Sequence, residues 1–134
     1  MNLNRLSVVV VVTLILGFTL HGCRAADEPK NTWPEAVKIR FPLDDIRPDG
    51  LRGPPDGLTS VAYEFCVPSD ASVYRELLQI DPALQIQPAS SGRVGCLASQ
   101  SLVIGETGQA GWRDMLEALS RLDYVEEIRE CHFE

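Results

Sequence analysis

Apolar and polar residues alternate in several short segments of this chain, with the period of two that is typical of half-buried β-strands. The clearest is the segment SVAYEFCV at residues 60–67, in which every second position from Val61 to Val67 is large and apolar. Residues 37–43 alternate in the same way. Because Pro42 has no amide hydrogen for a neighbouring strand, we expect this second segment to form a strand at the edge of a sheet.

Two further segments carry apolar residues three or four positions apart, which is the period of an amphipathic helix. The first begins after Ser69, a residue that favours helix N-termini, and ends at Asp81–Pro82 because the residue before a proline disfavours the helical conformation. Its apolar positions are Val73, Leu77 and Ile80. The second helix follows Gly108 and has its apolar positions at Trp112, Met115, Leu116, Leu119 and Leu122. We expect Trp112 to be buried in the core.

The remaining apolar segments predict three more strands. Residues 102–106 are a short apolar run suited to a central strand. Residues 84–98 give a weaker strand pattern, which is clearest at residues 93–98. Residues 124–133 predict the last strand, which the chain enters at Val125.

The predicted order β-α-β-β-α-β over residues 60–134 resembles the ferredoxin-like split β-α-β arrangement. The resemblance is one of element order, and it implies an α+β fold with a four-stranded antiparallel sheet and two helices on one face. We expect one domain over residues 36–134, with the extra edge strand at its N-terminus and its core at residues 60–134. The turn signals RPDG (47–50) and PPDG (54–57) separate the two parts. This fold hosts many unrelated activities, so it indicates no function by itself.

The first 22 residues have the pattern of an export signal. The uncharged apolar run from Leu6 to Leu20 is shorter than the roughly 20 residues that a membrane-spanning helix needs. The sequence LHGC at residues 20–23 resembles the lipobox of bacterial lipoproteins. This resemblance implies cleavage before Cys23, acylation of its thiol and new amino group, and a membrane anchor at that residue. Ordinary secretion with cleavage after Ala25, and an uncleaved anchor, are the alternatives.

The rest of the chain is acidic. The whole sequence has 12 basic and 19 acidic residues, a net charge of −7, and removal of the signal with its Arg5 leaves 11 − 19 = −8. Such a domain repels nucleic acid and anionic lipid heads, so we expect no nucleic-acid partner and membrane contact through the lipid anchor. Residues 23–35 are polar with two prolines and predict a tether. Arg24, where inner-membrane lipoproteins often have aspartate, favours the outer membrane of the cell envelope.

Three cysteines follow the anchor residue, namely Cys66, Cys96 and Cys131. Disulfides form in exported proteins, and three thiols allow three single pairings. The first and last strands of the expected sheet are neighbours, which favours a Cys66–Cys131 disulfide and leaves Cys96 on the far edge strand. Alternatively, all three are buried thiols, because cysteine is a common core residue.

The C-terminal residues ECHFE are the densest group of potential metal ligands in the sequence. In a strand, Glu130, His132 and Glu134 share one face and could bind a divalent cation together, while Cys131 points away. A solvated edge strand explains them equally well, and we expect no other cofactor. A cysteine enzyme would have to pair Cys66 with His132, the one histidine outside the signal, and no recognisable nucleophile motif surrounds Cys66. The sequence thus favours a non-catalytic domain.

Two other residues are candidates for contact with a partner. Glu64 interrupts an apolar strand, so the sheet face that carries Glu64 and Cys66 is either open to water or a docking surface. Trp33 lies in the tether and has no large apolar residue within three positions of it in the sequence. We therefore expect a membrane-tethered envelope lipoprotein whose small domain binds a protein or a small ligand. The alternatives are an inhibitor or immunity-type protein against a secreted, basic hydrolase, and a small metal-binding or enzymatic domain.

Overall fold

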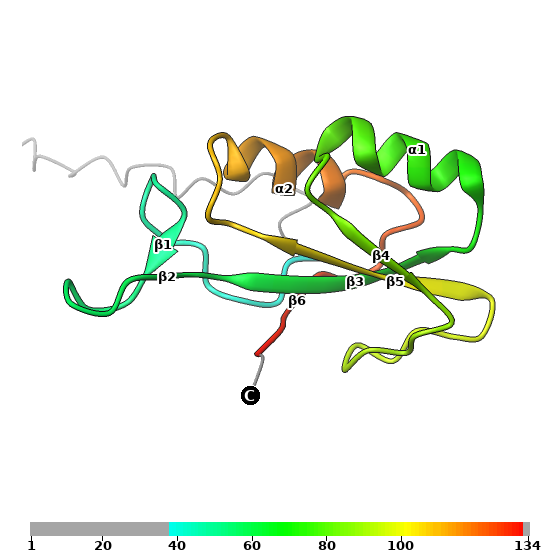
Figure 1. Cartoon of the computed structure of the whole chain (residues 1–134), viewed down its shortest axis with the longest axis horizontal. Coiled ribbons are helices and arrows are strands. Elements are labelled where there is room, and N and C mark those ends of the chain that lie inside the picture. Colours follow the sequence, from blue (N-terminus) through cyan, green and yellow to red (C-terminus); the bar gives the residue numbers. More distant parts are fainter. Residues whose placement is uncertain (1–37, 133–134) are drawn as a thin grey trace, which may run out of the picture. The chain divides into compact units, whose positions relative to one another are not determined.

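The computed structural model describes residues 38–132 of the chain. The predicted signal, the tether, Cys23, Trp33 and Glu134 lie outside these residues. The helices and strands, labelled in Figure 1, are β1 (Leu51–Arg52), β2 (Thr59–Ser60), β3 (Ala62–Pro68), α1 (Ala71–Ile80), β4 (Gln85–Pro88), β5 (Gln100–Glu106), α2 (Trp112–Ser120) and β6 (Arg129–Glu130).

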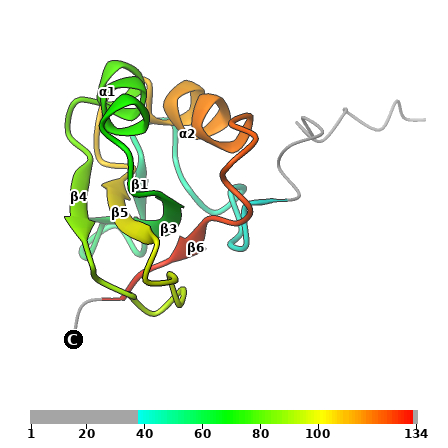
Figure 2. The ribbon, with the colours of Figure 1, turned by 90° about the vertical axis from the view of Figure 1, so that its right-hand side faces the viewer.

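The main sheet has four antiparallel strands in the order β4-β5-β3-β6. Both helices lie on the same face of this sheet, which Figures 1 and 2 show from two directions. β1 and β2 pair antiparallel in a separate two-stranded sheet. Its connections use the two predicted turns, in which the Gly50 amide donates to the Arg47 carbonyl and the Gly57 amide donates to the Pro54 carbonyl. The predicted α+β class is confirmed.

The main hydrophobic core lies between this sheet and the helices. β3 contributes Tyr63, Phe65 and Val67, whose side chains alternate with residues on the opposite face, as the sequence pattern predicts. The close packing of β5 on β3 requires a glycine opposite Tyr63, because a Cβ atom at Gly105 would lie 2.5 Å from the tyrosine ring. The helices contribute the fully buried leucines Leu77, Leu116 and Leu119.

Both predicted helices form, with one correction at the start of α1. The N-cap is Asp70, whose carboxylate accepts the Ser72 amide at 2.7 Å, whereas the hydroxyl of Ser69 pairs with Ser101. Aspartate and serine are about equally good N-cap residues, so the sequence alone does not decide between Ser69 and Asp70 as the start of this helix. Trp112 begins α2 and is buried as predicted; its indole N–H donates to the carbonyl of Pro48.

The predicted N-terminal edge strand is not a strand within the described residues. Ile39 makes a single parallel bridge to Ile128, and the Arg40 amide donates to the Ile128 carbonyl at 2.9 Å. The alternation nevertheless predicts burial correctly, since Ile39 and Phe41 are buried and Pro42 is exposed. The next amide on this side of the segment would be that of Pro42, which has no hydrogen to donate, and this explains why the pairing does not extend.

Two strands are shorter or differently placed than predicted. Within the described residues 124–132, the strand is confined to Arg129 and Glu130, which pair with β3. Just before β6, the amide of Ile128 donates to the Lys38 carbonyl, so the N-terminal segment pairs with the chain at this point. Residues 93–98 are turns and loop rather than a strand, and the strand of this region is β4.

Candidate binding site

The connection between β4 and β5, residues 89–99, crosses the sheet face that is opposite the helices (Figure 2). We call this segment the covering loop. Its backbone takes left-handed conformations at Ala89, Gly92 and Gly95, with φ of 61°, 56° and 84°. At Gly92 the loop comes so close to the sheet that a Cβ atom would lie 2.5 Å from the Leu102 side chain. The covering loop is therefore shaped to lie against this sheet face.

A disulfide between Cys66 and Cys96 fastens the covering loop to β3. The predicted Cys66–Cys131 pairing is wrong. The register explains why, because the Cys131 amide donates to the Ala62 carbonyl and so places Cys131 four residues along β3 from Cys66. The prediction also put Cys96 on a far edge strand, whereas the covering loop brings it back beneath the sheet. Cys66 and Cys96 have Cα atoms 5.3 Å apart, which suits a disulfide.

Glu64 lies beneath the covering loop and is only 2% exposed. One carboxylate oxygen accepts the Val94 amide of the loop at 2.6 Å. The carboxylate also accepts a hydrogen bond from the thiol of Cys131, which is the free cysteine among residues 38–132. Burial, and then this bond, raise the pKa of the Cys131 thiol. Glu64 therefore anchors the loop and is too buried to be the exposed docking residue that the sequence suggested.

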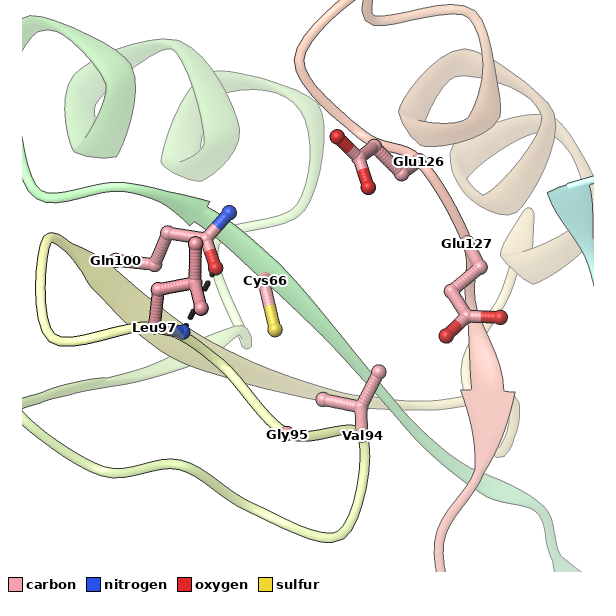
Figure 3. A pocket seen from close by; sticks show the side chains of 7 residues that line it. All are labelled: Cys66, Val94, Gly95, Leu97, Gln100, Glu126 and Glu127. Carbon is pink, nitrogen blue, oxygen red and sulfur yellow. Dashed lines mark hydrogen bonds between the residues drawn. The ribbon is translucent and has the colours of Figure 1, made fainter.

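A cavity of about 250 Å³ opens beside the disulfide, and we call it the Leu97 cavity. Its lining, drawn in Figure 3, consists of Cys66, Val94, Gly95, Leu97, Gln100, Glu126 and Glu127. Leu97 is 67% exposed, the larger exposure of the two exposed large hydrophobic residues among those described. The side-chain carbonyl of Gln100 accepts the Leu97 amide at 2.9 Å and holds that part of the loop in place.

The two carboxylates of the Leu97 cavity differ in their surroundings. Glu127 forms ion pairs with Arg40 at 3.7 Å and with Arg129 at 3.0 Å. Glu126 is exposed and forms no ion pair or side-chain hydrogen bond with another residue of the described part of the chain. Figure 3 shows Cys66 between the loop residues on one side and the two glutamates on the other. The cavity thus combines an exposed apolar side chain with one available negative charge.

Sequence reasoning missed Leu97 and Glu126 as site residues. The one available signal was Leu97 itself, a large apolar residue inside a stretch of small and polar residues after Cys96. Glu126 carries no local signal, because it belongs to a different part of the chain and reaches the cavity through the fold alone.

The predicted metal ligands are arranged for ion pairing. Glu130 forms a two-pronged ion pair with Arg52, which lowers the pKa of the Glu130 carboxyl, and His132 lies 3.6 Å from the same carboxylate. Glu134 lies outside the described residues. Among residues 38–132 there is no group of three or more histidine, cysteine, aspartate or glutamate side chains placed to hold a metal ion. Cys66 is bonded to Cys96 and is no nucleophile in this state.

Comparison of the chain with protein-family models, with curated proteins and with solved structures gave no match. Within the part of the chain that the structure describes, neither helix is long and apolar enough to cross a membrane.

Proposed function

We propose that this protein is a lipid-anchored, non-catalytic domain of the cell envelope that binds a protein partner in the Leu97 cavity. One observation carries the proposal: a large apolar side chain, Leu97, is 67% exposed on a loop that a disulfide holds to the sheet. An exposed apolar residue costs solubility, and a loop fixed before binding loses little conformational entropy when a partner arrives. Both features suit a binding site.

The proposed partner presents a basic segment to this cavity. A lysine or arginine side chain has an apolar stem and a cationic head. The stem would lie against Val94 and Leu97, and the head would reach the unpaired carboxylate of Glu126. The net charge of −8 that remains after removal of the signal would also attract a basic surface from a distance.

The anchoring part of the proposal rests on the LHGC sequence at residues 20–23. A disulfide in the folded domain is what an exported protein commonly contains, so it supports the same location. We also propose that the domain belongs to the ferredoxin-like arrangement. The support is the strand order β4-β5-β3-β6, in which a helix connects β3 to β4 and another connects β5 to β6.

Site-specific photocrosslinking in intact cells of the native host tests the binding site. A photoreactive amino acid replaces Leu97, and the matched control carries it at Leu78, which is 40% exposed on α1 across the sheet from the covering loop. We expect a discrete adduct from position 97 alone, mapped by mass spectrometry to a partner segment with lysine or arginine. Adding Glu126→Gln should weaken it about two- to fivefold, as for one exposed charge pair.

Equal adducts from both positions, no adduct from position 97, or a mapped segment without a cation would overturn the binding proposal. Anchoring is tested separately by the intact mass of the protein from the same cells. We expect the acyl chains on Cys23 and a chain that starts there, and we expect Cys23→Ser to remove them. An unlipidated chain that starts near Ala26 would refute the anchor.

A further inference from the structure

We propose that the Cys66–Cys96 disulfide is a reducible latch, which a dithiol opens to release the covering loop and dismantle the Leu97 cavity. The effect on binding rests on the proposed function above, whereas the opening of the loop does not. Structural disulfides of exported proteins resist reduction, whereas exposed disulfides are the labile or regulatory ones. This one lies on the sheet face away from the main core and lines a cavity that opens to solvent.

The two cysteine residues of the disulfide differ in exposure. Cys66 is partly exposed and lines the Leu97 cavity, where Figure 3 shows its sulfur among the cavity residues. Cys96 is 8% exposed and packs with Leu102 and Ile104. An incoming thiolate therefore reaches the sulfur of Cys66, and Cys96 is the leaving group.

The reaction balances with a dithiol as the reductant. Its first thiolate forms a bond to the Cys66 sulfur, the Cys66–Cys96 bond breaks, and Cys96 leaves as a thiolate that takes a proton from water. The second thiol of the reductant loses its proton and attacks the first sulfur of the reductant, which closes the reductant's own disulfide. Cys66 leaves as a thiolate and takes up a proton. Two electrons pass to the protein, which ends with two thiols. The unpaired carboxylate of Glu126 repels anions, so a reductant with a basic surface suits this cavity best.

Besides the disulfide, hydrogen bonds and one small cluster hold the covering loop. The Glu64 carboxylate accepts the Val94 amide, the Gln100 side chain accepts the Leu97 amide, and the Ser69 amide donates to the Ser99 carbonyl. The small cluster around Cys96 packs beneath the loop. Ala89 is a non-glycine residue with φ of 61°, and this strain disfavours the loop conformation when no tether holds it. The main core on the helix side is a separate cluster, so it does not depend on the loop. Reduction should open the loop and leave the rest of the domain folded.

The chain contains its own reporter of this opening. Cys131 is 8% exposed, and the hollow beside it is lined by Gly92 and Arg93 of the covering loop together with Glu64. When the loop leaves, this side of Cys131 becomes open to water and to alkylating reagents. Opening would also carry Val94 and Leu97 away from Cys66 and so take the cavity apart.

The test follows alkylation of Cys131 by N-ethylmaleimide in the full chain, with site-resolved mass spectrometry. We compare the oxidised protein, the protein reduced by dithiothreitol, and the variant Cys66→Ala/Cys96→Ala. Reduction and the double substitution should each speed alkylation of Cys131 by about tenfold or more, because loop opening then limits access less. Far-UV circular dichroism and cooperative urea unfolding should persist.

An unchanged alkylation rate at Cys131 after reduction would overturn the latch. So would reduction that proceeds no faster than global unfolding, because the disulfide would then be a staple reached only in the unfolded chain. Crosslinking from position 97 is measured in parallel and should fall after reduction. If position 97 gives no adduct even in the oxidised protein, the proposed function fails, and the Cys131 data alone decide whether the loop opens. If reduction exposes Cys131 but the adduct from position 97 persists, the result would refute the proposal that the disulfide controls binding.

Discussion

Removing the Cys66–Cys96 disulfide should lower the free energy of unfolding by an amount that the length of the closed loop sets. The cross-link joins residues 30 positions apart. The chain-entropy relation gives a loss of about 12 cal/mol/K for such a loop, or about 3.6 kcal/mol at 25 °C. Replacing the two sulfurs by hydrogen, as in Cys66→Ala/Cys96→Ala, removes buried volume and adds about 1 kcal/mol. We therefore expect a loss of about 4–5 kcal/mol.

Urea unfolding, followed by far-UV circular dichroism, measures this loss. Single domains have total stabilities of about 5–15 kcal/mol, and we expect this domain to lie far enough above the lower end for the variant to stay folded in water with a clearly lower midpoint. The slope against urea should rise, because an unfolded chain without the cross-link exposes more surface. The matched control is Cys131→Ala, which removes a buried sulfur and leaves the disulfide intact. It should cost about 1–2 kcal/mol with an unchanged slope.

The reasoning fails if the double variant loses no more stability than Cys131→Ala, or if its urea slope does not rise. Either result would mean that the disulfide does not restrict the unfolded chain in the way that its loop length implies. A variant that is unfolded in water would refute a different step, namely that the helix-side core is stable without the covering loop.

Three further predictions concern the covering loop and the ion pair between Arg52 and Glu130. Glu64→Ala should cost about 2–3 kcal/mol in urea unfolding, because it leaves a loop amide unpaired; an effect below 1 kcal/mol would show that Glu64 is not an anchor. Gly92→Ala should destabilise more than Gly95→Ala, because both have positive φ but only the first brings Cβ against β5; equal midpoints would contradict this. Pairing with Arg52 lowers the pKa of the Glu130 carboxyl in the folded protein. The stability that this ion pair contributes is therefore complete above the pKa of the carboxyl in the unfolded chain, and it is lost as the pH falls through the pKa in the folded protein. Arg52→Ala should flatten that acid dependence of the urea midpoint, and an unchanged profile would refute the assignment.

The elements that local pattern determines were predictable from the sequence. The alternation of Tyr63, Phe65 and Val67 predicted both a strand and the face that it buries. The spacing around Leu116 and Leu119 predicted α2 in the same way. These predictions hold because a buried face imposes its own period on the sequence, whatever the partner element is.

The errors arose where pairing between distant segments decides the outcome. Burial was predicted correctly for Ile39, but its partner is Ile128, and nothing local to either residue specifies a single parallel bridge. The expected Cys66–Cys131 disulfide followed from the correct neighbour strands, β3 and β6, and failed on register. A shift of four residues along a strand separates two positions on one face by about 13 Å, which is too far for a disulfide.

The candidate site was unpredictable for the same reason, and this bears on how it would work. Leu97 and Glu126 lie in separate segments that the fold brings to one cavity, and the Cys66–Cys96 bond fixes the loop that carries Leu97. A site assembled from the main core would stay intact as long as the domain is folded. A site assembled by one accessible covalent bond can be lost while the domain remains folded. After reduction we therefore expect the domain to remain folded, while the alkylation rate of Cys131 rises and crosslinking from position 97 falls.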